Sequence, residues 1–124
     1  MPKIKPMRLQ RKRTKGFHLE SPNGLGIVYV GRPSRWGNPY KVGDIYYQTD
    51  MSWMYPKKMR VRNAQDAVYQ YEKWIMEIMY TDPGRYKEMI VPLSGKNLSC
   101  FCPLDQPCHA DVLLKLANEE VEDA

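Results

Sequence analysis

The sequence predicts a small single-domain α/β protein with a mostly parallel sheet flanked by helices. Its 124 residues are enough for one domain and too few for two ordinary ones. The predicted elements alternate along the chain: a strand at residues 26–30, a helix from 63 to about 80, a strand at 97–102 and a helix at 108–118. Strands joined through a helix run parallel, with a right-handed crossover. The two strands should therefore be neighbours in one sheet.

The first predicted strand is a short run of β-branched and aromatic residues, Gly26-Ile27-Val28-Tyr29-Val30, with Gly31 after it. This composition is typical of a buried strand. Residues 31–39 follow and are rich in glycine, proline, serine and asparagine. Because these residues favour turns, we expect the strand to end in an irregular loop.

The helix that begins near residue 63 is the clearest element of the sequence. Asn63 is a good N-cap, and Asp66 stands three residues later, close to a capping-box pattern. Apolar residues then recur at steps of three and four, which predicts an amphipathic helix that ends at Asp82-Pro83-Gly84. These residues are Ala64, Ala67, Val68, Tyr71, Trp74, Ile75, Ile78 and Met79.

The remaining segments are less regular. Residues 40–56 show no clean period, and we expect them to contain a short strand followed by an insertion. Residues 85–91 predict a short helix or turn. The second buried strand covers 97–102, and residues 103–107 form a tight loop. The final helix opens at Cys108.

Basic residues are concentrated at the start of the chain, whose net charge is +5. The sequence predicts a basic N-terminal arm over residues 1–24, an α/β domain over 25–118 and an acidic tail over 119–124. Seven like charges repel and offer little to bury, so residues 1–15 should be mobile or extended rather than packed. The arm either attracts nucleic acid through its charge or is a solvated tail. The basic residues concerned are Lys3, Lys5, Arg8, Arg11, Lys12, Arg13 and Lys15.

Several classes of protein are excluded by what the sequence lacks. No apolar run approaches the ~18 residues that span a bilayer, and no apolar core follows the basic start as in a secretory signal. The three cysteines all lie within residues 100–108, which does not fit a secreted disulfide framework. We therefore expect a cytoplasmic protein with reduced thiols and no membrane partner. His18 is interpreted as a surface residue.

The loop at residues 31–39 is the first candidate ligand site. Arg32 and Arg35 offer guanidinium groups that match phosphate, and Trp36 offers a stacking face. Asn38 offers an amide that can make two hydrogen bonds to a ligand, and Ser34 is the remaining candidate ligand-binding residue of this loop. The alternative is a structural loop in which Trp36 fills the core and the arginines are solvated. The position of the loop after a predicted strand supports the ligand hypothesis, since ligands of open α/β sheets bind beyond the carboxyl ends of strands.

The segment from Cys100 to His109 is the second candidate site, and three interpretations remain open. In the first, Cys100, Cys102, Cys108 and His109 hold a zinc ion. In the second, Cys108 is a catalytic thiolate activated by His109 and a helix N-terminus, with Asp111 as a third catalytic candidate. In the third, the cysteines are buried small residues. We expect Arg32, Trp36 and Asn38 to share one pocket with Cys108 and His109.

Known motifs narrow the chemistry further. A nucleobase deaminase requires an H-x-E element and a later P-C-x-x-C, whereas here Pro107-Cys108 is followed by no second cysteine. The glycine-rich phosphate loop and the dinucleotide fingerprint are also missing from the sequence.

Two motifs resemble those of the DUF4326 family. The first is Val28-Tyr29-Val30-Gly31-Arg32-Pro33-Ser34-Arg35-Trp36-Gly37-Asn38-Pro39-Tyr40. The second joins residues 93–102 to Pro107-Cys108-His109-Ala110-Asp111-Val112-Leu113. The resemblance spans about residues 27–118. It implies a stand-alone domain of phage or prophage origin, and it assigns no activity. The basic arm lies outside it, and residues 44–60 look like an insertion.

Together these observations predict a protein that binds a nucleotide, a nucleoside or a nucleic-acid end. If the protein is an enzyme, hydrolysis or group transfer at a nucleoside or nucleotide is the expected reaction. One alternative is a zinc-stabilised nucleic-acid-binding module without catalysis. Another is a phage accessory protein that binds a host protein through the aromatic residues between Tyr46 and Tyr55. A phage-encoded protein would act in the host cytoplasm.

Overall fold

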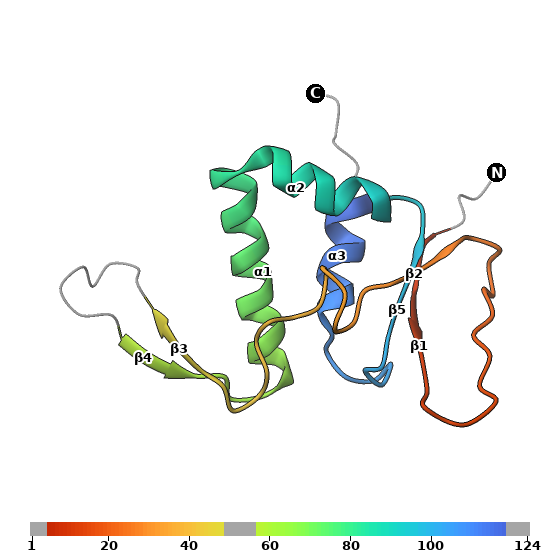
Figure 1. Cartoon of the computed structure of the whole chain (residues 1–124), viewed down its shortest axis with the longest axis horizontal. Helices are drawn as coiled ribbons and strands as arrows, with labels where there is room; N and C mark the ends of the chain where they lie inside the picture. Colours follow the sequence, from red (N-terminus) through yellow and green to blue (C-terminus); the bar gives the residue numbers. More distant parts are fainter. Residues whose placement is uncertain (1–4, 49–56, 119–124) are drawn as a thin grey trace.

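The computed structural model describes residues 5–48 and 57–118, and a three-stranded parallel sheet lies at its centre (Figure 1). The strand order is β1-β5-β2, so the last strand of the chain is the middle strand of the sheet. The strands are β1 (Arg8–Gln10), β2 (Ile27–Tyr29) and β5 (Asn97–Cys100). The predicted parallel pairing of β2 with β5 is confirmed: Ile27 aligns with Asn97 and Tyr29 with Ser99.

Three helices pack to one side of the sheet and the long loop of residues 11–26 lies to the other (Figure 1). The helices are α1 (Ala64–Thr81), α2 (Pro83–Ile90) and α3 (His109–Asn118), with a short 3-10 helix, η1 (Val91–Leu93), before β5. This arrangement confirms the predicted small α/β class. Both predicted long helices are present, and α2 is the short helix expected near residues 85–91.

The start of the chain differs from the sequence-based expectation of an unpacked arm. β1 pairs with β5 in parallel, with Arg8 opposite Leu98 and Gln10 opposite Cys100. Leu9 is buried in the core. A central strand needs a partner on each side to satisfy its backbone groups, and β1 supplies the second one. The residues from Arg8 to Gln10 therefore belong to the folded domain.

Local sequence signals account for the ends of α1. The Asn63 side chain accepts a hydrogen bond from the backbone N–H of Asp66 at 2.8 Å, as the capping pattern predicts. At the other end, Asp82 closes α1 and also caps α2, since its Oδ1 accepts from the Arg85 N–H. Pro83 then occupies the first turn of α2, where no backbone donor is needed. The predicted helix stop is therefore also a helix start.

An antiparallel hairpin projects from the domain between β2 and α1 (Figure 1). It consists of β3 (Ile45–Gln48) and β4 (Lys57–Arg60), and Tyr47 lies opposite Lys58. The segment predicted as an insertion thus contains both strands. Trp53, Tyr55 and the predicted acidic tail at 119–124 lie outside the described residues.

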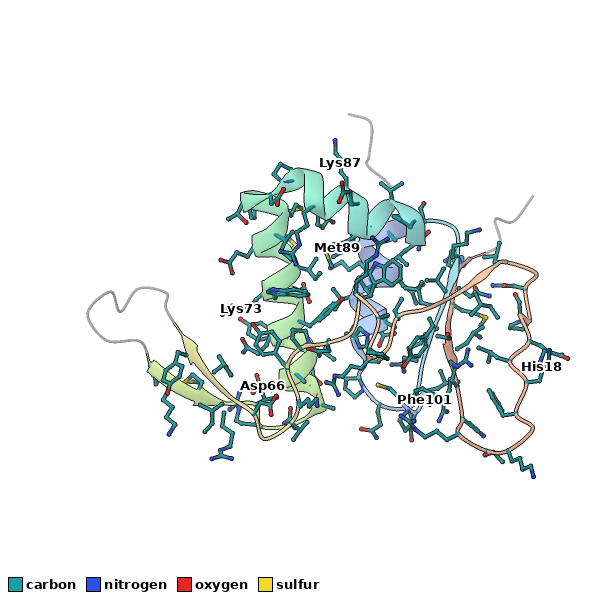
Figure 2. All side chains as sticks on the ribbon, in the orientation of Figure 1. His18, Asp66, Lys73, Lys87, Met89 and Phe101 are labelled. Atoms are coloured by element: carbon teal, nitrogen blue, oxygen red, sulfur yellow. The ribbon has the colours of Figure 1, made fainter. Side chains whose placement is uncertain are left out.

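The core lies between the sheet and the helices. Its fully buried side chains include Tyr71 and Ile75 from α1, Leu98 from β5 and Leu113 from α3. His18 is exposed on the outer loop, as expected (Figure 2). Within the described residues, none of the helices has the length and apolar character that crossing a bilayer requires.

Candidate functional site: a pocket at the carboxyl ends of the strands

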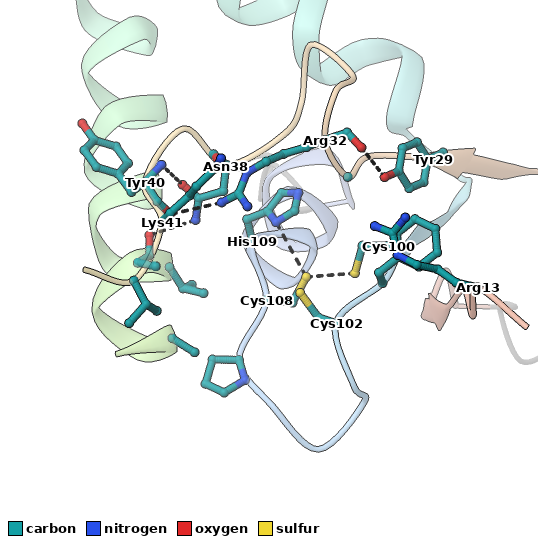
Figure 3. Close-up of a pocket in the computed structure, with 17 residues that line it drawn as sticks. Arg13, Tyr29, Arg32, Asn38, Tyr40, Lys41, Cys100, Cys102, Cys108 and His109 are labelled. Carbon is teal, nitrogen blue, oxygen red and sulfur yellow. Dashed lines mark hydrogen bonds between the residues drawn. The ribbon is translucent and has the colours of Figure 1, made fainter. Parts of the chain in front are cut away.

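A pocket of about 300 Å³ opens where the three parallel strands end (Figure 3). Each strand leads into it: Arg13 follows β1, Gly31 and Arg32 follow β2, and Phe101 and Cys102 follow β5. The first turns of α1 and α3 form the rest of the wall. We call this cavity the carboxyl-edge pocket. It lies in the position where open α/β sheets bind their ligands.

Positive charge dominates the lining of the carboxyl-edge pocket. Arg13, Arg32 and Lys41 line it, and the lining residues include no aspartate or glutamate. Three aromatic residues, Tyr29, Tyr40 and Phe101, complete much of the wall. Because no carboxylate neutralises these cations within the pocket, the cavity favours an anion.

Arg32 is held in place by the loop that carries it. Its Nε donates to the Asn38 carbonyl at 2.7 Å and its Nη2 to the Tyr40 carbonyl at 3.3 Å. The Tyr29 hydroxyl donates to the Arg32 carbonyl. The Nη1 group makes no hydrogen bond within the described part of the chain, so it is free to donate to a ligand.

Arg13 lies on the opposite wall. Its guanidinium lies 4.2 Å from the centroid of the Phe101 ring, and that ring meets Tyr29 edge to face at 5.9 Å. A cation over an aromatic face is stabilised by the ring quadrupole. Arg13 and Phe101 are therefore positioned together, whereas the sequence predicts an unpacked arm at Arg13.

Asn38 lines the carboxyl-edge pocket but uses its amide within the protein. Its Nδ2 donates to the Ala67 carbonyl at 3.1 Å, and its Oδ1 accepts from the Tyr40 N–H at 2.8 Å. The side chain is 6% exposed. Asn38 therefore joins the loop to α1, and the predicted bidentate contact with a ligand is not available in this arrangement.

Trp36, Ser34 and Arg35 lie outside the carboxyl-edge pocket, contrary to the expectation for Trp36. The Trp36 ring packs against the core, and its Nε1 donates to the Met89 carbonyl at 2.7 Å. Arg35 covers that ring, 4.5 Å from its centroid. The Ser34 hydroxyl donates to the Gly31 carbonyl and stabilises a turn. Trp36 therefore packs as the structural alternative describes, and Ser34 and Arg35 contact the loop rather than the pocket.

The three cysteines form one cluster in the wall of the pocket. The Sγ atoms of Cys100, Cys102 and Cys108 all lie within 4.8 Å of one another, and those of Cys100 and Cys108 are 3.0 Å apart. Cys100 and Cys108 are buried, whereas Cys102 is half-buried. Three thiols at this separation can hold a metal ion such as zinc.

His109 adjoins the cluster. Its Nε2 lies 2.7 Å from the Val30 carbonyl oxygen, which can only accept, so Nε2 carries the proton. The lone pair of Nδ1 therefore faces the Cys108 Sγ at 3.7 Å. A histidine whose second nitrogen donates to a carbonyl is the usual arrangement of a metal ligand. His109 is nevertheless not among the three residues whose ligand atoms all lie within 4.8 Å.

The thiols influence one another strongly. Hydrogen bonds from the Cys100 and Cys108 thiols lower the pKa of Cys102 to about 3, and the nearby charges of Arg8 and Arg32 act in the same direction. The pKa of Cys100 is raised, first because its proton is held by Cys102 and Cys108 and then because the thiol is buried. The hydrogen bonds among the three thiols therefore favour negative charge on Cys102, the most accessible sulfur of the cluster, over Cys100.

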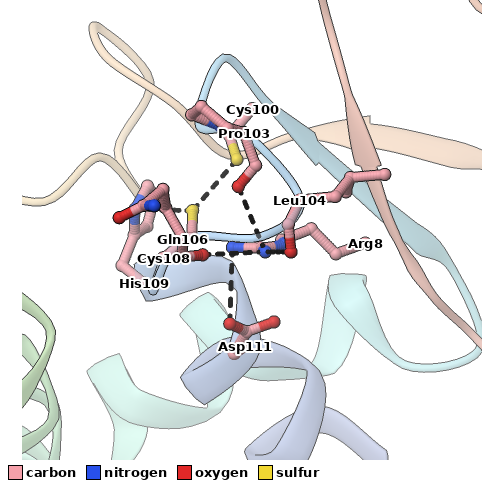
Figure 4. Close-up of polar contacts among 8 residues, drawn as sticks. All are labelled: Arg8, Cys100, Pro103, Leu104, Gln106, Cys108, His109 and Asp111. Carbon is pink, nitrogen blue, oxygen red and sulfur yellow. Dashed lines mark hydrogen bonds and ion pairs between the residues drawn. The ribbon is translucent and has the colours of Figure 1, made fainter. Parts of the chain in front are cut away.

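Arg8 holds the loop between Cys102 and Cys108 in place (Figure 4). Its Nη2 donates to the carbonyls of Leu104 at 2.8 Å and Gln106 at 2.9 Å, with a longer contact to Pro103 at 3.4 Å. Its Nη1 lies 3.4 Å from Asp111 Oδ2. The Arg8 side chain is only 9% exposed.

The residues of this site differ from the predicted set. Asp111, a catalytic candidate, is absent from the pocket lining and forms an ion pair with Arg8 on an exposed turn of α3. Arg8 itself was missed, because in the sequence it is one of many basic residues near the N-terminus. Arg13, Tyr29, Tyr40 and Lys41 were missed as well; of these, only Tyr29, near the end of the strand predicted at residues 26–30, lay where the sequence already pointed to a ligand site.

The sequence comparisons identify the family of the chain. The chain matches the family described as domain of unknown function DUF4326 over residues 9–119. No curated protein and no solved structure matches the chain. The match begins within β1, in agreement with the place of that strand in the folded domain.

Proposed function

The chain belongs to the DUF4326 family, and we propose that its carboxyl-edge pocket binds the phosphate-bearing part of a nucleotide. The observation that carries the proposal is the convergence of Arg13, Arg32 and Lys41 on one cavity without an acidic residue in its lining. Guanidinium groups match phosphate oxygens in geometry as well as in charge. The N-terminus of α3 also meets this pocket at His109, where its dipole favours an anion.

The aromatic residues support a nucleotide rather than a free inorganic anion. Tyr29, Tyr40 and Phe101 line the same cavity as the cations. Ring faces beside a phosphate site suit a ribose or a base, because every base has a π-face that stacks on an aromatic side chain. A volume of about 300 Å³ is in the range of small-molecule sites.

We further propose that Cys100, Cys102 and Cys108 bind zinc in the wall of this pocket. Thiolate-rich sites select soft or borderline ions, and zinc accepts three thiolates with one further ligand. Three thiolates around Zn²⁺ carry a net negative charge, which Arg8 and Arg32 would offset. His109 Nδ1 is the nearest candidate for the fourth position; otherwise that position would open toward the pocket.

A second candidate function follows from the contact between Cys108 and His109. An imidazole lone pair 3.7 Å from a thiol can accept its proton, as in enzymes with a cysteine nucleophile. In that case the reaction is hydrolysis or group transfer at the bound nucleotide. A Cys108 sulfur that binds zinc is not free to act in this way, so metal content distinguishes the two candidates.

Two measurements test the proposed function. Isothermal titration with nucleoside 5′-monophosphates should give binding that Arg32→Ala weakens about 10- to 100-fold, because a charge-assisted hydrogen bond is lost. Lys87→Ala is the matched control, since Lys87 is exposed on α2 and lies outside the pocket lining. Equal affinity in wild type and Arg32→Ala, or no binding at all, would overturn the nucleotide proposal.

Elemental analysis tests the metal. Protein purified without chelator should contain about one zinc per chain, and Cys108→Ser should lose the metal together with thermal stability. A metal-free wild type that turns over a nucleotide, with Cys108→Ser inactive but stably folded, would instead establish the nucleophile. A metal-free, inactive wild type whose stability Cys108→Ser leaves intact would leave the cysteines a structural role only.

A further inference from the structure

Two basic segments flank the carboxyl-edge pocket on opposite sides. The 11–26 loop begins with exposed Arg11, Lys12, Arg13 and Lys15. On the other side, the β3–β4 hairpin exposes Lys57, Lys58 and Arg60 on β4. Figure 1 shows the loop and the hairpin extending from opposite ends of the molecule, with the strand ends between them.

The pocket joins these two segments. Arg13 belongs to the loop and Lys41 to the base of the hairpin, and both line the carboxyl-edge pocket. Arg32, in the segment between β2 and the hairpin, lines it as well. Cations therefore lie in the 11–26 loop, in the pocket lining and on β4, and we call this series of residues the track. A single nucleotide in the pocket would leave the exposed cations at both ends of this track without a phosphate.

A second cavity lies beside the pocket, on the side of the hairpin. It has a volume of about 540 Å³, lies between β3 and α1, and shares Tyr40 with the carboxyl-edge pocket. We call it the tyrosine groove. Six aromatic residues are among those that line it: Tyr40, Tyr46, Tyr47, Tyr69, Trp74 and Tyr80.

The charges around the tyrosine groove are divided between its two sides. Glu72 and Glu77 belong to the α1 wall, with Lys73 beside them. On the hairpin, Lys58 lies directly opposite Tyr47 in the strand pairing. A phosphate backbone would therefore follow the hairpin side, and its bases would face the rings and α1. Rings at such a site contact unpaired bases, because in a duplex the base faces are already stacked.

We propose that the ligand of the carboxyl-edge pocket is part of a single-stranded nucleic acid, whose phosphates follow the track from the 11–26 loop to β4. This inference rests on the proposed function, because one nucleotide of the strand occupies the pocket. The adjoining nucleotides stack in the tyrosine groove. The track contacts only backbone and base faces, so it binds with little sequence preference.

Fluorescence anisotropy with labelled dT12 and rU12 oligonucleotides tests the proposal over a salt series. The plot of log affinity against log salt loses about 0.7 in slope for each phosphate contact removed from a single strand. Lys57→Ala/Lys58→Ala and Lys12→Ala/Lys15→Ala should each flatten the slope by ~1.4. Lys87→Ala/Lys115→Ala removes two exposed lysines from α2 and α3 and should leave the slope unchanged. The two oligonucleotides distinguish DNA from RNA as the preferred strand.

Tyr47 provides a test that does not involve charge. The side chain is 62% exposed, so its removal does not disturb the core. Tyr47→Ala should weaken oligonucleotide binding at least about 5-fold without a change in slope, and Tyr47→Phe should retain the affinity, because stacking needs only the ring. Equal loss in both variants would contradict a stacking role.

The outcomes separate this inference from the proposed function. If mononucleotide binding responds to Arg32→Ala but the oligonucleotides bind no more tightly and ignore the lysine variants, the strand inference fails and the pocket proposal stands. If the oligonucleotides follow the lysine variants while mononucleotides do not bind, the pocket proposal fails and the inference built on it fails too. Binding of duplex DNA or heparin as tight as that of dT12 would show a general polyanion surface and overturn the single-strand inference.

Discussion

The Nε2 atom of His109, at the start of α3, lies 2.7 Å from the carbonyl oxygen of Val30, at the end of β2. The contact is buried, and it fixes both the tautomer and the direction of the imidazole. It also connects the two sequence motifs that resemble the family, since Val30 belongs to the first and His109 to the second. The orientation of Nδ1 toward Cys108 follows from it.

Replacement of His109 should therefore have two effects. It removes the Nε2 contact with Val30, which stabilises the fold, and it removes the Nδ1 atom that faces Cys108 in the thiol cluster. His109→Ala leaves the Val30 carbonyl without a partner and should lower the free energy of unfolding by about 1–3 kcal/mol. His109→Gln can still donate an amide N–H toward Val30 and should restore part of that loss, while neither variant supplies an Nδ1 lone pair. Urea denaturation measures the difference. His18→Ala, at the exposed second histidine, should change stability by less than ~0.5 kcal/mol.

Arg8 should control the loop between Cys102 and Cys108. Arg8→Met removes the donor shared by the Leu104 and Gln106 carbonyls and should cost about 1.5–3 kcal/mol, because bonds to a charged group are lost. Arg8→Lys keeps the charge without the planar fork and should lie between wild type and Arg8→Met. Asp111→Asn should cost less than ~1 kcal/mol, since the Asp111 carboxylate is exposed. Chemical denaturation would measure all three, and equal stabilities would contradict the role of Arg8.

Asp66 should make stability dependent on pH in the acid range. Its pKa is lowered, chiefly by the hydrogen bond from the Arg62 backbone N–H and also by the Gln70 amide, although burial opposes the shift. A lowered folded-state pKa stabilises the fold above the ordinary value near 3.8, and the gain is lost as pH falls through the folded-state pKa. Wild type should therefore exceed Asp66→Asn in stability at about pH 7 and approach it near pH 3. A constant difference across that range, measured by urea denaturation, would refute this assignment.

Although Trp36 and Arg32 belong to the same loop, replacing Trp36 should lower mainly the stability of the fold, and replacing Arg32 should lower mainly the nucleotide affinity. Trp36→Phe loses the hydrogen bond to the Met89 carbonyl and part of the core packing, and should cost about 1–3 kcal/mol of stability. Its nucleotide affinity should stay within about 2-fold of wild type. Thermal denaturation and isothermal titration on the same samples make the comparison. An affinity loss in Trp36→Phe larger than that of Arg32→Ala would reverse the assignment.

The parts of the fold that depend on local patterns were predictable from the sequence. The Asn63 cap, the apolar stripe of α1 and the stop at Asp82 are each encoded within a few residues, and they appear as predicted. The parallel pairing of β2 with β5 followed from the helices between them. The convergence of Arg32 with Cys108 and His109 followed in turn from the strand ends.

The remaining features depend on partners far away in the sequence. β1 reads as a run of basic residues, and only its pairing with β5 and the carbonyls around Arg8 explain why it is folded. For Trp36, the sequence cannot distinguish a ring that stacks on a ligand from one that packs against the core, because both need the same side chain. The Met89 carbonyl, 53 residues away, decides between them.

The place of β5 at the centre of the sheet has a consequence for synthesis on the ribosome. Both β1 and β2 emerge early, but within the described residues each pairs only with β5, and Arg8 and Leu98 lie 90 positions apart. No strand of this sheet can complete its backbone hydrogen bonds until nearly the whole domain has left the exit tunnel. Until then, β1 and β2 have unpaired edges, and contacts of such high sequence separation form slowly. Nascent chains of this protein should therefore depend on rapid completion of synthesis, or on a chaperone, more than the nascent chains of a helical protein of the same length do.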